Sequence, residues 1–133
     1  MSKMEINYLG DEKTEITHLD TNEKLITDLP KDNGGRGRNF SPTDLLAASM
    51  GSCIVTIMAK MATRDGYEIA GAKIIVDKEM SKDSPRRVAK LTGTITFPNV
   101  ITEQQKKKLM AAVKACPVHN SLHPDIVVDF QVK

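Results

Sequence analysis

Two cysteines are the side chains of this sequence best suited to chemistry. Cys53 lies in a run of small and apolar residues, and Cys116 directly precedes a proline. Their separation in the chain excludes the CxxC spacing of thioredoxin-like motifs. Only the thiolate is nucleophilic, and an ordinary thiol with a pKa of about 8.5 is mostly protonated at neutral pH. Each cysteine could be a reactive thiol with an activating neighbour, or a small buried apolar side chain.

Several groups could activate these thiols. The segment 30–39 reads PKDNGGRGRN, and its glycines predict a mobile loop that carries Arg36 and Arg38. Either arginine, or a group from a second subunit, could stabilise a Cys53 thiolate. The loop could instead cradle a phosphate, but no Walker pattern follows it. His119 lies three residues after Cys116 and could polarise that thiol.

A metal site is the competing interpretation of the same residues. Cys116, His119 and His123 are spaced by three and four residues, and Cys53 could complete a set of four zinc ligands. Structural zinc sites usually contain paired CxxC-like clusters, which this sequence lacks. We therefore expect no metal and no other cofactor.

Composition narrows the class of protein. The 133 residues predict a single domain spanning 1–133. Lys and Arg number 19 against 17 Asp and Glu, and aromatic residues make up only 4%, so a nucleic-acid partner is not expected. No signal peptide opens the sequence, which favours a cytoplasmic location. The longest apolar run, residues 45–59, is shorter than the roughly 20 residues of a membrane span, so we expect a buried helix and no membrane partner.

Hydrophobic periodicity predicts an α+β fold with the order βββ-α-ββ-α-β and a largely antiparallel sheet. Three short strands come first, near residues 4–8, 14–18 and 25–29. A long helix follows, and then two strands at 72–80 and 89–97. Thr102 and Gln105 form a capping box for a second helix that continues to Cys116 and ends at Pro117. Alternating apolar residues at 126–132 predict the last strand.

The long helix has the clearest local signals. Ser41 suits its N-cap, Pro42 its first position and Asp44 its third, and Gly66 is a natural stop after Arg64 or Asp65. Its middle is apolar almost all round, so it must be covered on every side. A second copy of the chain could supply that cover, so we expect a dimer. The small residues beside Cys53 leave room for a small molecule or for close helix packing.

Two segments resemble the OsmC/Ohr family, the osmotically inducible and organic hydroperoxide resistance proteins. Residues 39–53 read NFSPTDLLAASMGSC and residues 115–122 read ACPVHNSL. Both motifs, their order and the flanking strands agree with the family. The resemblance implies an intertwined homodimer with two long central buried helices and active sites at the subunit interface.

The resemblance also implies a chemistry. Cys53 would be the peroxidatic cysteine, whose thiolate attacks the O–O bond of an organic hydroperoxide and becomes a sulfenic acid. Cys116 would then form a disulfide with it, and an external dithiol would reduce that disulfide. No prosthetic group is needed.

This sequence departs from the family pattern at the activating groups. Peroxidases of the family have a Glu after the motif's proline, where this chain has Thr43, and the carboxylate of Asp44 comes one residue later. The family's activating Arg lies in the N-terminal hairpin, which here offers Lys13 and no Arg. Lys13, Arg36 or Arg38 could substitute. The sequence therefore predicts a divergent thiol peroxidase, and the alternative is a non-catalytic binder of small hydrophobic ligands or a redox sensor.

Overall fold

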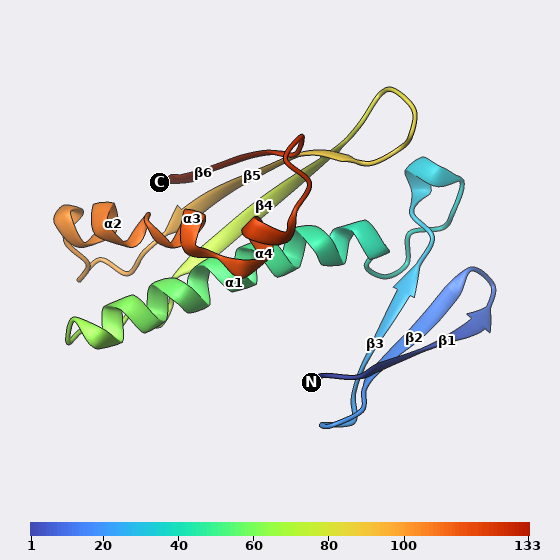
Figure 1. The fold of residues 1–133 in the computed structure, drawn as a ribbon, viewed down its shortest axis with the longest axis horizontal. Coiled ribbons are helices and arrows are strands. Elements are labelled where there is room, and N and C mark those ends of the chain that lie inside the picture. The colour runs from blue at the N-terminus through green and yellow to red at the C-terminus, as the bar shows by residue number, and fades with distance from the viewer. The chain divides into compact units, whose positions relative to one another are not determined.

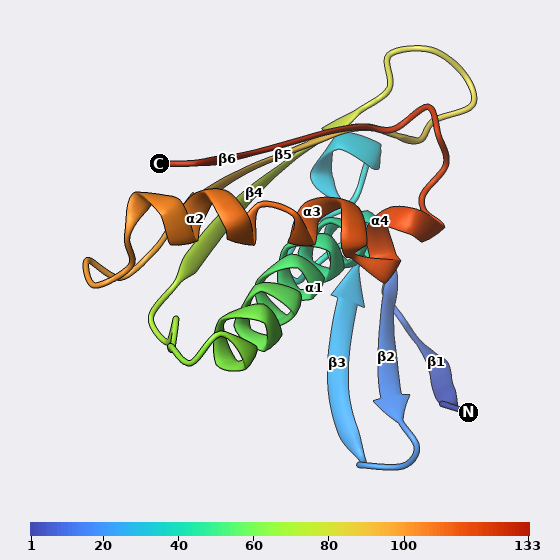
Figure 2. The ribbon, with the colours of Figure 1, turned by 60° about the vertical axis from the view of Figure 1, so that its left-hand side comes forward.

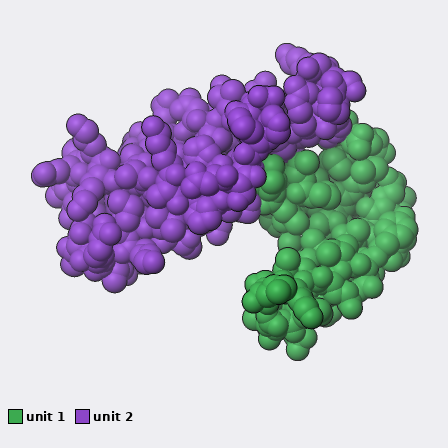
Figure 3. Space-filling model, in the orientation of Figure 1, with its two compact units in different colours: residues 1–46 green, residues 47–133 purple.

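The computed structural model describes all residues, 1–133. The chain separates into two compact units, residues 1–46 and residues 47–133 (Figure 3). The first unit holds a sheet of three strands, and the second holds another sheet of three strands with most of the helical residues (Figure 1). Each unit is described by itself.

The first unit is an antiparallel meander, as the alternating residues predicted. Strand β1 (Met4–Gly10) pairs with β2 (Lys13–His18), which pairs with β3 (Glu23–Asp28). Asp11 and Glu12 make the first turn with φ of 55° and 65°, which is the backbone hand that matches twisted hairpins. Apolar side chains of β1 are exposed, with Ile6 at 59% and Tyr8 at 70%.

The glycine-rich segment after β3 folds back on the end of that strand through backbone hydrogen bonds. A short 3-10 helix, η1 (Lys31–Asn33), begins it. Gly35 N–H donates to the Pro30 carbonyl at 2.9 Å and Gly37 N–H to the Leu29 carbonyl at 3.0 Å. A Cβ on Gly35 would lie 2.1 Å from the Leu29 carbonyl oxygen. Gly35 therefore allows the close approach of two backbone segments.

Helix α1 (Pro42–Arg64) begins and ends where its capping signals predicted. Ser41 Oγ accepts from the Asp44 N–H at 3.0 Å, and Asp44 Oδ2 accepts from the Ser41 N–H at 2.9 Å. This reciprocal pair is a capping box. Gly66 follows the helix with φ of 87°, a left-handed conformation that glycine adopts readily.

Within one chain, α1 is buried along one face only, and 33% of its most apolar stretch is buried. Met50, Ile54 and Met58 are fully buried. Ala48 and Ser52, on the other side, are exposed. By length and composition alone, α1 could cross a membrane. The core helices of soluble proteins often meet the same criterion.

The second unit is built on strands β4 (Lys73–Met80), β5 (Val88–Thr96) and β6 (Val127–Val132). The β4–β5 pair is antiparallel as expected, but β5 and β6 are parallel. The helical segment between β5 and β6 makes this a crossover connection, which parallel neighbours require. The sequence predicted a largely antiparallel sheet, and the β5–β6 pair departs from that prediction because it is parallel.

Two glycines let the layers of this unit approach closely. A Cβ on Gly51 of α1 would lie 2.8 Å from Val76 Cγ2 on β4, so α1 packs directly on the sheet. A Cβ on Gly93 would lie 2.2 Å from the ring of Phe130, its register partner on β6. Residues 91, 93 and 95 of β5 are buried while residues 94 and 96 are exposed. The helices therefore cover one face of the sheet (Figure 2).

The second helical segment differs from the single helix that the sequence predicted. It is divided into α2 (Glu103–Leu109), α3 (Ala112–Ala115) and α4 (Pro117–Ser121). Thr102 and Gln105 form the expected capping box on α2. Pro117 starts α4 instead of ending a helix, because the residue before a proline is driven out of the helical region and Cys116 is extended, with ψ of 121°.

Candidate functional site

The second unit brings the two cysteines together. Cys53 lies on α1 and is partly exposed, whereas Cys116 lies at the junction of α3 and α4 and is fully buried. Both are free thiols, and the neighbouring Cys53 thiol contributes to the raised pKa of Cys116. The small neighbour Gly51 serves the close packing of α1 on β4, which is one of the two roles that the sequence left open for it.

The environment of Cys116 keeps its thiol protonated. Burial is the largest cause that raises the pKa of Cys116, and the hydrogen bond with Cys53 acts in the same direction. The backbone of His119 and that of Val118 act in the opposite direction and partly offset the rise in this pKa. Of the two thiols, Cys116 is therefore suited to donate its S–H to Cys53, which leaves Cys53 as the exposed candidate nucleophile.

His119 holds the turn that carries Cys116. Its Nδ1 lies 2.7 Å from the Val113 carbonyl oxygen. A carbonyl only accepts hydrogen bonds, so Nδ1 carries the proton and donates. This bond joins α3 to α4 on either side of Cys116. The arrangement makes His119 a residue that positions Cys116, a role that its spacing in the sequence did not indicate.

Arg38 is engaged by two carboxylates inside the first unit. Its Nε donates to Asp28 Oδ2 at 2.7 Å, and its Nη1 donates to Asp11 Oδ2 at 2.8 Å. The Arg38 backbone N–H also donates to Asp28 Oδ2, at 2.9 Å. The side chain of Asp28 is 0% exposed. Its hydrogen bonds with Arg38 hold the pKa of Asp28 far below the usual range and raise that of Arg38.

The other three candidate activators differ in the hydrogen bonds and ion pairs that they already make. Asp44 Oδ2 accepts the Ser41 N–H, so this carboxylate caps α1. Arg36 makes only a longer ion pair with Asp11, at 3.5 Å, and its side chain is 65% exposed. Lys13 begins β2 and has no carboxylate within ion-pair distance. Arg36 and Lys13 are therefore bound less closely by carboxylates than Arg38 is.

The residues of the zinc hypothesis do not form a metal site. No group of three or more His, Cys, Asp or Glu side chains is arranged to hold a metal ion. The Nδ1 atom of His119 donates to Val113, and that of His123 accepts from the Asp125 N–H at 3.1 Å. Of the four residues, Cys116 is the N-cap of α4, His119 lies within α4 and His123 follows it.

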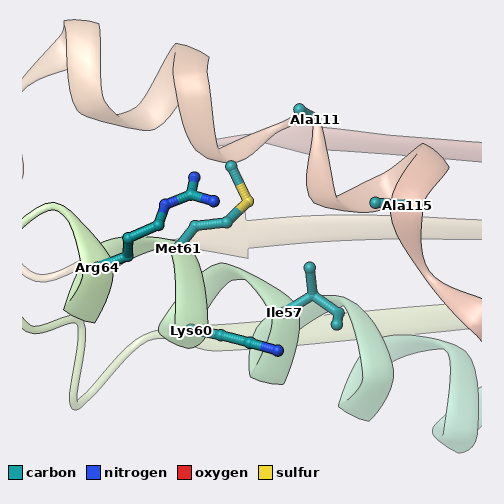
Figure 4. A pocket seen from close by; sticks show the side chains of 6 residues that line it. All are labelled: Ile57, Lys60, Met61, Arg64, Ala111 and Ala115. Carbon is teal, nitrogen blue, oxygen red and sulfur yellow. The ribbon is translucent and has the colours of Figure 1, made fainter.

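A groove lies along α1 next to the cysteines, and sequence reasoning did not single it out. It has a volume of about 520 Å³ and is lined by Ile57, Lys60, Met61, Arg64, Ala111 and Ala115 (Figure 4). Ile57 is one helical turn beyond Cys53, and Ala115 directly precedes Cys116. The signal in the sequence was the i, i+4 spacing of Lys60 and Arg64 on an otherwise apolar helix.

Comparison with known proteins agrees with this fold. A crystal structure from Psychrobacter arcticus, of a protein whose name refers to osmotic stress and a detoxification response, is 40% identical, with a TM-score of 0.93 over 100% of this chain and 96% of that one. An organic hydroperoxide resistance protein OsmC of Legionella pneumophila shares the fold at 15% identity and a TM-score of 0.81, over 100% of this chain and 96% of that one. An uncharacterized protein of Acinetobacter baylyi is 29% identical over 105 residues, which are 78% of this chain and 73% of that protein.

The family model for OsmC-like proteins matches residues 34–131. That span includes both cysteines, α1, β4, β5 and all of β6 except Val132. The chain therefore belongs to the OsmC-like family, as its two motifs indicated.

Proposed function

We propose that this protein is a thiol peroxidase that reduces organic hydroperoxides, with Cys53 as the peroxidatic and Cys116 as the resolving cysteine. The observation that carries the proposal is the neighbouring pair of one partly exposed and one buried thiol. The hydroperoxide resistance named for the Legionella protein agrees with this role. The fold alone would not assign it, because one fold hosts many functions.

The proposed reaction has two halves. The Cys53 thiolate attacks one oxygen of the hydroperoxide, the O–O bond breaks, and protonation of the leaving oxygen releases an alcohol and leaves a sulfenic acid on Cys53. The Cys116 sulfur then attacks the Cys53 sulfur and forms a disulfide with loss of water. An external dithiol reduces the disulfide and is itself oxidised.

Turnover of cumene hydroperoxide by the purified protein, with dihydrolipoamide as the dithiol, tests this proposal. We expect faster consumption of cumene hydroperoxide than of hydrogen peroxide. Cys53→Ser should abolish consumption of both, while circular dichroism remains that of the parent. Cys116→Ser should allow a first reaction with peroxide but little turnover with the dithiol. Undiminished turnover by Cys53→Ser would overturn the proposal.

One observation favours a second candidate function, a non-catalytic binder of small hydrophobic ligands or a redox sensor. The Arg38 guanidinium, one of the expected activators, is already bound by Asp28 and Asp11. If no other cation activates Cys53, the chain would bind apolar molecules without reducing peroxides. Tight binding of such a molecule, with no peroxide consumed by either thiol, would support this candidate.

We also propose that two copies of the chain form a homodimer. Only 33% of the most apolar part of α1 is buried within one copy. Apolar side chains of β1 add to the uncovered surface, with Met4 55% and Ile6 59% exposed. Burial of such surface is the main drive for association. The family resemblance, which implies an intertwined dimer, agrees with this.

A further inference from the structure

We propose that the hydrogen bond from His119 to the Val113 carbonyl controls how fast the two thiols join, because it holds Cys116 beside Cys53. Without this bond, a sulfenic acid on Cys53 persists longer and is oxidised further by a second peroxide. His119 is a positioning residue in this account, since it acts through Cys116. The inference rests on the proposed function for its link to peroxides, but the joining of the two thiols is tested without peroxide.

The chain around Cys116 is not held by its own two helices. Cys116 is the C-cap of α3 and the N-cap of α4, and neither helix has a side-chain cap at its start. The first has four residues and the second has five, and helices this short are not stable in water by themselves. In a continuous helix, the N–H of residue 117 would donate to the Val113 carbonyl. Pro117 has no N–H, so that hydrogen bond is missing at this position.

The His119 side chain supplies the donor that Pro117 lacks. Its Nδ1 donates to the Val113 carbonyl oxygen at 2.7 Å, in a part-buried position. The bond therefore ties α3 to α4 across the break in the helix. A buried acceptor that loses its donor costs free energy, so this bond opposes opening of the turn that carries Cys116.

The position of Cys116 decides the fate of an oxidised Cys53. A disulfide forms only when the two Cα atoms lie roughly 4.4–6.8 Å apart, so a small displacement of the turn prevents it. A sulfenic acid on Cys53 can react with the Cys116 thiol, which gives the disulfide and water. It can instead react with a second hydroperoxide, which gives a sulfinic acid and an alcohol. The ratio of the two products therefore reports how firmly Cys116 is held.

The joining step can be followed with one equivalent of dithiobis(nitrobenzoate), an aromatic disulfide that releases a coloured thiolate. The Cys53 thiolate attacks one sulfur of the reagent, releases a first aromatic thiolate and keeps the other half as a mixed disulfide. The Cys116 sulfur then loses its proton, attacks the Cys53 sulfur and releases the second aromatic thiolate. The rate of this second release, measured by stopped-flow absorbance, is the rate at which the two cysteines join.

Three substitutions of His119 separate its hydrogen bond from its bulk. His119→Ala should slow the second release about fivefold, which corresponds to the usual net contribution of one neutral hydrogen bond. The first release should stay unchanged. His119→Asn places an amide N–H where Nδ1 stands and should restore most of the rate. His119→Gln is closer to His in size, but its amide lies one bond further from the backbone, so it should not restore the rate.

His123→Ala is the matched control. This histidine is exposed and follows α4, and its Nδ1 accepts the Asp125 N–H at 3.1 Å. The control should therefore keep the parent rate of second release. The inference would be overturned by a parent rate in His119→Ala, by restoration with Gln and not with Asn, or by a parent protein that shows no second release.

Excess cumene hydroperoxide connects the inference to catalysis. Intact mass distinguishes the disulfide, which lacks two hydrogens, from the sulfinic acid, which has gained two oxygens. We expect a larger share of sulfinic acid in His119→Ala than in the parent protein and in His123→Ala. An unchanged share would count against the inference. If no variant consumes the hydroperoxide, the peroxidase alone is refuted, because the second thiolate release still measures the role of His119.

Discussion

At the scale of single residues, the molecule gives its two thiols different environments. Cys116 is fully buried and its pKa is raised, chiefly by burial, whereas Cys53 is partly exposed. A reaction with an external peroxide needs an accessible thiolate, and resolution needs a second thiol within reach. The proposed roles, peroxidatic for Cys53 and resolving for Cys116, follow from this difference in burial.

The raised pKa of Cys116 predicts slow alkylation. In the Cys53→Ser variant, we expect the rate of reaction of Cys116 with iodoacetamide to rise with a midpoint above the pKa of about 8.5 of an ordinary thiol. Burial disfavours the thiolate, so the free energy needed to ionise it is higher than in water. Mass spectrometry of quenched samples measures the rate. A midpoint below that of a free thiol would contradict the account of this site.

Asp28 predicts a pH-dependent effect on stability. Its pKa is lowered in the folded state, chiefly by hydrogen bonds with Arg38, so the ionised carboxylate stabilises the fold at pH values above the unfolded pKa of about 3.9. That contribution is lost as the pH falls toward the lower folded value. Asp28→Asn should therefore lower the urea midpoint at neutral pH, and the difference from the parent should shrink in acid.

A matched substitution checks that the effect belongs to this contact. Asp32→Asn, at an exposed position in η1, removes the same charge nearby. It should leave the urea midpoint closer to that of the parent than Asp28→Asn does. A loss that is equal for both variants, or constant from neutral to acid pH, would contradict the role given to Asp28.

At the scale of the elements, the local signals of the sequence predicted the helix ends and most strands. The capping boxes at Ser41 and Thr102 depend on residues three positions apart, so they can be read directly. The sequence predicted that the helix ends at Pro117, but it did not predict that a new helix, α4, begins there. Proline is well suited to a first helical position. The parallel β5–β6 pair could have been predicted from the helical segment between these strands.

The contact between β5 and β6 predicts the effect of a small substitution. Gly93→Ala should destabilise the protein by about 1–3 kcal/mol, because the new methyl group would overlap the Phe130 ring and force it to move. Urea unfolding followed by circular dichroism measures the loss. In a Phe130→Leu background the same substitution should cost less, since the ring is gone. An equal cost in both backgrounds would contradict direct packing of these residues.

At the scale of the whole molecule, the uncovered apolar surface is the main feature. The sequence predicted that α1 needs cover on every side, and within one chain it is covered along one face. The meeting of Cys53 and Cys116 could not be predicted from spacing, because residues so far apart are brought together only by tertiary packing. The resemblance to the family motifs predicted that the two cysteines act as a pair, whereas local sequence patterns did not predict it.

The uncovered face of α1 predicts the oligomeric state. Light scattering after size exclusion should give about twice the chain mass of 14.6 kDa. Ala48→Glu places a charge on the exposed face of α1, so it should shift the protein toward the monomer. Asn99→Glu, at an exposed position outside α1, is the control and should remain dimeric. A parent protein that is monomeric at micromolar concentrations would contradict the proposed dimer.

The most direct test of the central claim is the intact mass of the reduced protein after one equivalent of cumene hydroperoxide. If Cys53 and Cys116 form the proposed redox pair, each chain loses two hydrogens, and Cys116→Ser instead gains one oxygen. Cys53→Ser should keep its mass. An unchanged mass of the parent protein, with both thiols still open to alkylation after unfolding, would contradict the account.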